Sequence, residues 1–429
     1  MNRFDIIEKI LDELLQSGST IDYIKELKEK SLDMVSKDRS LSEVLNDIAL
    51  DIENITRMFL DAENEYSTKY ISGISTGIYL PDYSGLGSYK YILIGGDKKR
   101  GEDSPIDFDT LFDVAYITKL YTLVLLFKLE ELGLIDLNTK VKDLNPDIQG
   151  LEDFTLNDLV RLHGELRTNG NVATASSYEE AYERLKSVYL VSNDRTKNTY
   201  TDFGALVISD TIEKVISKVF GKDMKFDEIM NEFLFKPLYI KNTTFTPGVI
   251  NITGNATLDG LPHDPKSRAL NGVTGHAGIF TNSEDLTHLA DGVFDGEYLS
   301  GEHVRRLGER TFEGSPKGNL GLYIKNGNGW ADTYTGPEFS DGSFSHQGWT
   351  GVTATFDPNN KIHNSILANA IYESEDKEQV KNNKPVGYSK QFGLYQCEIT
   401  KRIMLMYVAK KYFNKYCNIR EDINVTKMI

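Results

Sequence analysis

The chain has 429 residues, 40% of them hydrophobic, and it contains 20 Phe and 23 Tyr. This apolar content is ample for a packed core and excludes an intrinsically disordered chain. The formal net charge of −16 disfavours nucleic acids and anionic membranes as partners, because both are negatively charged.

The first 66 residues are predicted to form three helices. Apolar residues recur at helical spacing over residues 6–15, and Gly18 follows as a helix end. A second helix is expected over residues 21–35. A third is expected over residues 40–64, where the opening segment SLSE offers capping chemistry. Charges interrupt the apolar positions of the first helix, so it is not a secretory signal, and we expect a cytoplasmic protein.

After these helices the pattern changes to strands. Residues Tyr70–Leu80 and Tyr89–Gly95 are rich in β-branched and aromatic side chains and are separated by turn residues, which predicts a hairpin. A strongly apolar helix is then expected from Ile117 to about Leu132, ended by Gly133. Because this helix is apolar on nearly every face, it should be buried.

The middle of the chain is predicted to be mostly helical up to about residue 310. Strand signals return after Gly318, at residues 320–325, 343–347, 352–356 and 364–371. A last amphipathic helix is expected over about Glu398–Tyr416. The longest apolar run, Ile403–Ala409, is too short to span a bilayer. The two cysteines, Cys397 and Cys417, are too few for a disulfide framework or a cysteine-based zinc site.

Strands at both ends with helices between them predict an α+β fold. We expect one antiparallel sheet, assembled from both halves of the sequence and flanked by helices, with a helical insert at about 120–310. The expected organisation is an N-terminal helical extension over 1–68 and a main domain over 69–429.

Four short motifs follow one another along the main domain. They are DTLFDVAYITKL at 109–120, YTDFG at 200–204, HDP at 263–265 with GVTGHAGIFT at 272–281, and SHQGWTG at 345–351. Each motif alone recurs by chance, but four in this order are specific. Over about residues 70–371 the chain thus resembles the serine β-lactamase and penicillin-binding-protein superfamily, in the branch of class C β-lactamases, esterases and D-aminopeptidases. The resemblance implies a β-lactamase/transpeptidase-like fold and chemistry on acyl, ester or amide bonds.

The resemblance also implies roles for individual residues. In this family a serine at the start of a buried helix attacks an acyl carbonyl, and a lysine three residues later helps to take its proton. Lys119 matches that lysine, Tyr200 matches the proton shuttle, and Asp202 completes the same motif. The strand residue that faces the substrate would be His346. The implied substrate-binding residues are Gly348, Trp349, whose N–H would be an oxyanion donor, and His276, which is expected to fix a loop.

The chain departs from the family at the nucleophile, because Tyr116 holds the position of the serine. Thr118, Ser345 and Thr201 are the nearest other hydroxyls, and helix and strand geometry should turn each of them away. A neighbouring Lys⁺ is expected to lower the pKa of Tyr116. The phenol oxygen lies farther from the backbone than a serine oxygen, however, so an attack would miss one oxyanion donor. A second departure is DLVRLHGEL at 158–166, where relatives usually have DLLTHTSGL.

Structural interpretations of the same residues stay open. Lys119 could be a buried lysine that pairs with Asp202 for folding alone, and Tyr200 could be a packed aromatic residue with a satisfied hydroxyl. The seven histidines show no metal-ligand spacing, so we predict no metal site and no cofactor.

Three hypotheses for function follow. The first is a family member without standard serine chemistry, which binds a small acyl, ester or peptide ligand in the retained pocket. The second is an active hydrolase or acyltransferase that uses Tyr116 as nucleophile with Lys119 and Tyr200 as acid and base. The third is an interaction protein that binds a protein partner through residues 1–68.

Overall fold

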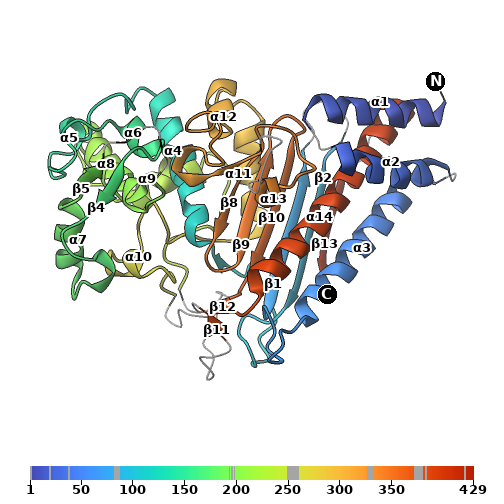
Figure 1. The fold of residues 1–429 in the computed structure, drawn as a ribbon, viewed down its shortest axis with the longest axis horizontal. Helices are drawn as coiled ribbons and strands as arrows, with labels where there is room; N and C mark the ends of the chain where they lie inside the picture. Colours follow the sequence, from blue (N-terminus) through green and yellow to red (C-terminus); the bar gives the residue numbers. More distant parts are fainter. Residues whose placement is uncertain are drawn as a thin grey trace.

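A mixed seven-stranded sheet forms the centre of the molecule, with helices on both of its faces (Figure 1). The computed structural model describes residues 2–18, 21–36, 39–81, 87–192, 194, 197, 199–248, 260–325, 332–371, 380–381, 384–419 and 422–429. No helix in these ranges combines the length and the apolar character needed to cross a bilayer.

The sheet has the strand order β13-β2-β1-β10-β9-β8-β7. Its strands are β1 (Gly73–Leu80), β2 (Tyr89–Gly96), β7 (Tyr323–Ile324), β8 (Phe344–Gly348), β9 (Val352–Asp357), β10 (Ile362–Ala368) and β13 (Ile423–Met428). The predicted hairpin and the predicted assembly from both halves of the sequence are confirmed, because β1 pairs with β2 on one side and with β10 on the other. The expected antiparallel arrangement holds for every pair in this sheet except one, since β13 runs parallel to β2.

Three small ladders lie outside the main sheet. They pair β3 (Phe112–Asp113) with β6 (Phe280–Thr281), β4 (Glu165–Arg167) with β5 (Tyr189–Ser192), and β11 (Val380–Lys381) with β12 (Lys384–Pro385).

The described helices are spread along the whole chain. They are α1 (Arg3–Gln16), α2 (Ile21–Ser36), α3 (Leu41–Asp61), α4 (Thr118–Glu131), α5 (Val141–Leu144), α6 (Leu156–Val160), α7 (Tyr178–Lys186), α8 (Phe203–Phe220), α9 (Phe226–Met230), α10 (Pro265–Ala269), α11 (Ser283–Phe294), α12 (Gly301–Leu307), α13 (Asp332–Thr335) and α14 (Tyr388–Lys411). Short 3₁₀ or π turns occupy Ala115–Ile117, Val172–Thr174, Asn231–Phe235, Asn319–Gly321 and Tyr412–Tyr416.

The three predicted N-terminal helices are confirmed, and they pack on one face of the sheet together with α14 (Figure 1). Reciprocal capping boxes begin α1 at Asn2 and α3 at Ser40. Between α3 and α14 the rings of Phe59 and Tyr395 stack with centroids 4.6 Å apart. The buried residues of these helices and those of β1, β2 and β10 form one hydrophobic cluster.

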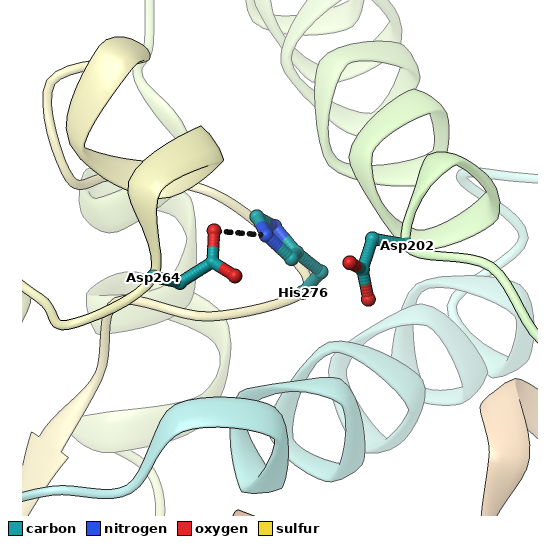
Figure 2. Close-up of side chains that lie close together, drawn as sticks. All are labelled: Asp202, Asp264 and His276. Atoms are coloured by element: carbon teal, nitrogen blue, oxygen red, sulfur yellow. Dashed lines mark hydrogen bonds and ion pairs between the residues drawn. The ribbon is translucent and has the colours of Figure 1, made fainter. Parts of the chain in front are cut away.

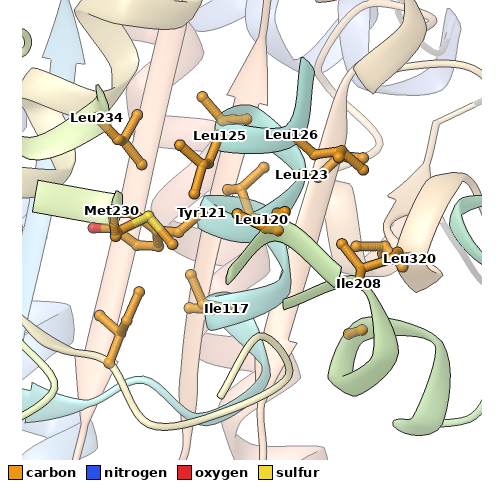
Figure 3. Packing of buried hydrophobic residues seen from close by; sticks show 14 of the residues in the cluster. Ile117, Leu120, Tyr121, Leu123, Leu125, Leu126, Ile208, Met230, Leu234 and Leu320 are labelled. Carbon is orange, nitrogen blue, oxygen red and sulfur yellow. The ribbon is translucent and has the colours of Figure 1, made fainter. Parts of the chain in front are cut away.

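Helix α4 is the centre of the second hydrophobic cluster, on the opposite face of the sheet (Figures 1 and 3). Its residues from Thr118 to Phe127 are all buried, as predicted for a helix that is apolar on every side. Ile208 of α8, together with Met230 and Leu234 near the end of α9, packs around it (Figure 3). This close packing gives the first turn of α4 a fixed position.

The C-terminal region differs from the prediction. Helix α14 begins at Tyr388, ten residues before the predicted start at Glu398, directly after Gly387 in a left-handed turn. Polar residues in its first turns weaken the amphipathic pattern, which explains the late predicted start. Strand β13 was not predicted, because it is short and mostly exposed, and its only alternating apolar residues at the start are Ile423 and Val425.

Candidate active site

A strained turn sets the position of Tyr116 at the entrance to α4. Ala115 has a φ of +44°, which is unfavourable for a residue with a Cβ atom. The turn is held on both sides, because the N–H of Val114 donates to the Ile279 carbonyl at 3.1 Å and the Thr350 hydroxyl donates to the Asp113 carbonyl at 2.6 Å. Backbone strain of this kind gathers at functional sites, and here it lies beside the predicted nucleophile position.

Lys119, Tyr200 and Asp202 come together as the sequence predicted. The Lys119 amine lies 3.0 Å from the Tyr200 hydroxyl and 2.9 Å from a carboxylate oxygen of Asp202. Burial lowers the pKa of Lys119, and the attraction of Asp202 opposes that shift. Tyr200 is 42% exposed, but its hydroxyl points inward to the amine. Burial, followed by the charges of Asp202 and Asp264, raises the pKa of Tyr200 well above its ordinary value.

Asp202 lies between two lysines at the start of α8. Its second carboxylate oxygen accepts a hydrogen bond from Lys266 at 2.9 Å, and Lys119 holds the first. Burial alone would raise the pKa of Asp202, but Lys119, His276 and Lys266 together hold it far below its usual range. Asp202 is therefore a permanent anion at neutral pH.

A second carboxylate, Asp264, lies close to Asp202 (Figure 2). It caps α10, where it accepts hydrogen bonds from the backbone N–H groups of Lys266 and Ser267 at 2.9 Å each. The imidazole of His276 lies 2.9 Å from it. Burial alone would raise the pKa of Asp264, but His276 and the cap bonds hold it below the usual range. Sequence reasoning had considered the histidines of this motif and missed Asp264, although an Asp-Pro pair signals a helix start.

His276 is fully buried, with its other ring nitrogen 3.1 Å from the Thr274 hydroxyl. Both of its nitrogens thus have partners within the protein. Its ring centroid lies 6.4 Å from that of Tyr116. This histidine fixes the loop that carries Thr274 beside the α4 entrance.

The phenol of Tyr116 extends into this polar cluster. Its ring lies under the Lys119 amine, 3.8 Å from amine to centroid, and its hydroxyl is hydrogen-bonded to Asp264. Burial raises the pKa of Tyr116, and the charges of Asp202 and Asp264 raise it further. The expectation that Lys119 would lower this pKa is therefore wrong: the two carboxylates and the loss of water outweigh the lysine.

Gly348 allows strand β8 to approach the α4 entrance. A Cβ atom at this position would lie 2.5 Å from the Val114 carbonyl oxygen. The next residue, Trp349, is 39% exposed, and its N–H makes no hydrogen bond with any other described residue. This free donor is what an oxyanion site requires.

His346, two residues earlier on β8, is almost completely buried. Its Nδ1 lies 2.9 Å from the Gln347 carbonyl oxygen, while its Nε2 is buried without a hydrogen-bond partner in the described chain. Burial lowers its pKa well below the ordinary value, and the charges of Lys119 and Lys317 lower it further. His346 is thus neutral at physiological pH and adds no charge to the site.

The other hydroxyls near Tyr116 are committed to the fold. Thr118 accepts a hydrogen bond from the Ile279 N–H at 3.2 Å, and Ser345 donates to the Tyr334 carbonyl at 2.9 Å. Thr201 accepts from the N–H of Phe203 at 3.2 Å. Each of these three hydroxyls is thus already engaged in a hydrogen bond of the fold.

Lys317 is a further cation near this cluster that sequence reasoning missed. Its amine lies 5.3 Å from the ring centroid of Tyr200 and donates to the Gly321 carbonyl at 3.2 Å. Burial, followed by repulsion from Lys119, lowers its pKa to about 7. It belongs to none of the four motifs, and only the folded chain brings it near Tyr200.

The donor atoms of Asp202, Asp264 and His276 lie within 4.8 Å of one another, the sole cluster of this kind found in the described ranges (Figure 2). Two carboxylates and an imidazole suit a divalent cation. Each donor is already engaged, however, because Asp202 carries two lysine amines and Asp264 holds His276. A metal ion would have to displace both lysines, so these residues fit an internal salt-bridge network better than a metal centre.

Comparison with curated proteins identifies relatives over most of the chain. An N-acetylmuramyl-L-alanine amidase of Bacillus subtilis (strain 168) is 28% identical over 307 residues, covering 61% of this chain and 68% of the relative. A putative D-alanyl-D-alanine carboxypeptidase of Salmonella gallinarum (strain 287/91 / NCTC 13346) is 28% identical over 309 residues, covering 61% and 69%.

Comparison with solved structures identifies proteins of similar fold. D-amino acid amidase from Ochrobactrum anthropi SV3 superposes with a TM-score of 0.55 at 15% identity, over 83% of this chain and 98% of that chain. EstCE1, a hydrolase with promiscuous acyltransferase activity, superposes with a TM-score of 0.58 at 17% identity, over 82% of this chain and 99% of that chain. The penicillin-binding protein homologue from Pyrococcus abyssi superposes with a TM-score of 0.56 at 18% identity, over 81% of this chain and 76% of that chain.

These neighbours share one fold, so the predicted β-lactamase/transpeptidase-like architecture is confirmed. The Beta-lactamase family model matches residues 83–384, a range that contains all four motifs and more than half of the chain. The chain belongs to the β-lactamase family.

Proposed function

We propose that this chain is a β-lactamase-family protein that has lost serine chemistry and binds an acyl, ester or peptide ligand beside the former nucleophile position. The state of Tyr116 carries this proposal. Its hydroxyl is bound to Asp264, and its pKa is raised, so the nucleophilic phenolate is disfavoured at neutral pH. Its ring centroid also lies 3.8 Å from the Lys119 amine, so this amine is engaged in a cation–π contact with Tyr116.

A cavity between the end of β8 and the first half of α14 supports ligand binding, although Tyr116, Lys119 and Tyr200 are not among its lining residues. It has a volume of about 330 Å³, and its lining includes Gln347, Gly348 and Gly351 of the β8–β9 turn region together with Lys384 and Gln396. This volume lies at the lower end of the range for small-molecule sites.

Two features of the cavity wall favour a polar ligand group. The Lys384 amine lies 4.8 Å from the Trp349 ring centroid and 4.9 Å from that of Tyr388, and burial lowers its pKa to about 8. The side-chain oxygen of Gln396 is buried without a hydrogen-bond partner in the described chain. A ligand with a carboxylate for Lys384 and an N–H donor for Gln396 would satisfy both groups.

The test compares the wild type with Tyr116→Ser, Tyr116→Ala and Tyr116→Phe. Each protein is incubated with p-nitrophenyl esters, nitrocefin and a fluorophosphonate probe, and both turnover and intact mass are measured. We expect a silent wild type and a gain of turnover or acylation in Tyr116→Ser, because the serine would regain Lys119 as its base. Tyr116→Ala opens the same space without a nucleophile and should stay silent.

Enzyme-like turnover by the wild type would overturn the loss of chemistry. Ligand binding is tested separately by calorimetry with a short peptide that ends in D-alanine, the group named in one set of relatives. Lys384→Ala should weaken this binding about tenfold, because it removes a charge-assisted contact. Equal binding by the wild type and Lys384→Ala would remove the cavity from the proposal.

A second function is favoured by one observation, the intact contact between Lys119 and Tyr200 at 3.0 Å. In this alternative Tyr116 is the nucleophile of a hydrolase or acyltransferase, with these two residues as acid and base. It requires an acyl adduct on Tyr116 and complete loss of activity in Tyr116→Phe. Labelling at any other residue would contradict it.

A further inference from the structure

A second cavity lies at the opposite edge of the sheet, between α3 and the strands β2 and β13. Its volume is about 300 Å³. It is called the edge slot here and is lined by Ser42, Leu45, Asn46, Asp47, Ala49, Leu50, Glu53, Tyr89, Tyr91, Ile423, Val425 and Lys427. The family model ends at residue 384 and begins at residue 83, so α3 and β13 both lie outside the matched range. The edge slot is therefore built largely from elements outside the range that the family model matches.

The strand register explains how its floor forms. Ile423 pairs with Tyr89, and Val425 pairs with Tyr91, so these four side chains share one face of the sheet. Tyr89 and Tyr91 are almost fully buried. The roof comes from a single stripe of α3, whose lining positions recur at helical spacing. Seven of the twelve lining residues are aliphatic or aromatic, and the other five are polar or charged.

One polar group of the floor has no partner. The hydroxyl of Tyr89 is buried and makes no hydrogen bond in the described chain. A buried unpaired hydroxyl is costly, and an acceptor placed beside it would recover the lost hydrogen bond. Burial raises the pKa of Tyr89, so this hydroxyl stays protonated and is available as a donor.

Two of the charged side chains that line the edge slot neutralise each other. Glu53, which is 5% exposed, forms an ion pair with Lys427 and also lies 3.4 Å from the Tyr91 hydroxyl. A charged ligand would disturb this pair or meet the carboxylates of Glu53 and Asp47. We propose that the edge slot is a second ligand site, which takes a neutral and mainly apolar small molecule that offers one hydrogen-bond acceptor to Tyr89.

The test uses octan-2-one, a neutral ketone that cannot be hydrolysed and so cannot be mistaken for a substrate of the other site. Ligand-observed NMR should give saturable binding in the millimolar range or tighter, as expected for a molecule of this size. Octanoate, with the same chain length and a negative charge, should bind at least tenfold more weakly.

Two variants locate the binding. Tyr89→Phe should weaken ketone binding about fivefold, because it removes only the hydrogen bond. It should fold normally, since the lost hydroxyl has no partner. Ala49→Leu should abolish binding by filling the edge slot. The matched control is Tyr79→Phe, in which the lost hydroxyl donates to Asp291 at 2.7 Å outside the edge slot, and it should bind like the wild type.

The proposal is overturned by an absence of saturable ketone binding, by equal binding in the wild type and Tyr89→Phe, or by tighter binding of octanoate. Because Tyr89→Phe conserves shape, the test stands even where Ala49→Leu does not fold. None of these results depends on the chemistry of Tyr116, so the edge slot and the proposed function can fail separately.

Discussion

Gly348 is the residue on which the geometry around Tyr116 most directly depends. A methyl group there would lie 2.5 Å from the Val114 carbonyl oxygen, so β8 and the strained turn would have to separate. We expect Gly348→Ala to lower the free energy of unfolding by about 1–3 kcal/mol and to cancel any activity gained by Tyr116→Ser. Urea denaturation and ester turnover measure the two effects. Gly393→Ala is the matched control, because nothing lies within 4 Å of its added methyl group and it should be neutral or stabilising.

Glu338 is a buried carboxyl that gives stability a pH dependence. It is 2% exposed, and burial raises its pKa from 4.5 to about 7, although the Thr400 hydroxyl donates to it at 2.9 Å. Because the carboxyl binds its proton more tightly in the folded state than in the unfolded state, protonation of Glu338 stabilises the folded protein. This stabilisation is complete below pH 4.5 and is lost as the pH rises through 7. The stability of the wild type relative to Glu338→Gln should therefore fall by about 1.4 kcal/mol per unit from pH 5 to pH 7. Urea unfolding at pH 5, 6, 7 and 8 measures this difference, and a constant difference would contradict it.

At the scale of the elements, the packing of the N-terminal helices indicates that they are part of the main fold. Phe59 stacks on Tyr395, and Lys411 forms an ion pair with Glu13, so α3 and α1 are joined to α14 by both apolar and charged contacts. We expect deletion of residues 2–61 to yield a chain that is aggregated or lacks cooperative unfolding, because it uncovers one hydrophobic cluster. Circular dichroism and thermal melting of the truncated chain measure this. A truncated chain with the wild-type melting temperature would instead favour an independent interaction arm.

The elements also differ in how far the sequence could predict them. Helix α4 and the β1–β2 hairpin were predictable because periodicity and composition agree in both. Strand β13 could not be predicted, since its six residues carry only a short strand pattern and its pairing partner β2 lies far away in the sequence.

The site shows the same division. Lys119, Tyr200 and Asp202 were assigned through motifs. Asp264 lies in the HDP motif but was given no role there, and Lys317 lies outside the motifs and comes near Tyr200 only in the folded chain. Burial, followed by the charges of Asp202 and Asp264, reversed the expected direction of the pKa shift of Tyr116, and no local sequence pattern encodes either effect.

At the scale of the whole molecule, two hydrophobic clusters share one sheet. The N-terminal helices and α14 cover one face, and α4 covers the other (Figure 1). Because β1, β2 and β10 contribute side chains to both clusters, neither face can lose its order without disturbing the other. We expect α3 and α4 to lose hydrogen-exchange protection at the same urea concentration. Earlier loss of protection in α3 would show that residues 1–68 unfold as a separate unit.

The pairing of distant segments also means that some contacts of the fold can form only late in translation. Thr76 of β1 is hydrogen-bonded to Tyr395 of α14 at 2.8 Å, although 319 residues separate them in the chain. At about 5–20 residues per second, a ribosome needs roughly 15 to 60 seconds to make that stretch. During this time the apolar faces of α3 and β1 have no partner from the C-terminal half. The half-made chain, rather than the finished protein, is thus the form most exposed to aggregation, and its survival depends on what shields those faces as it is translated.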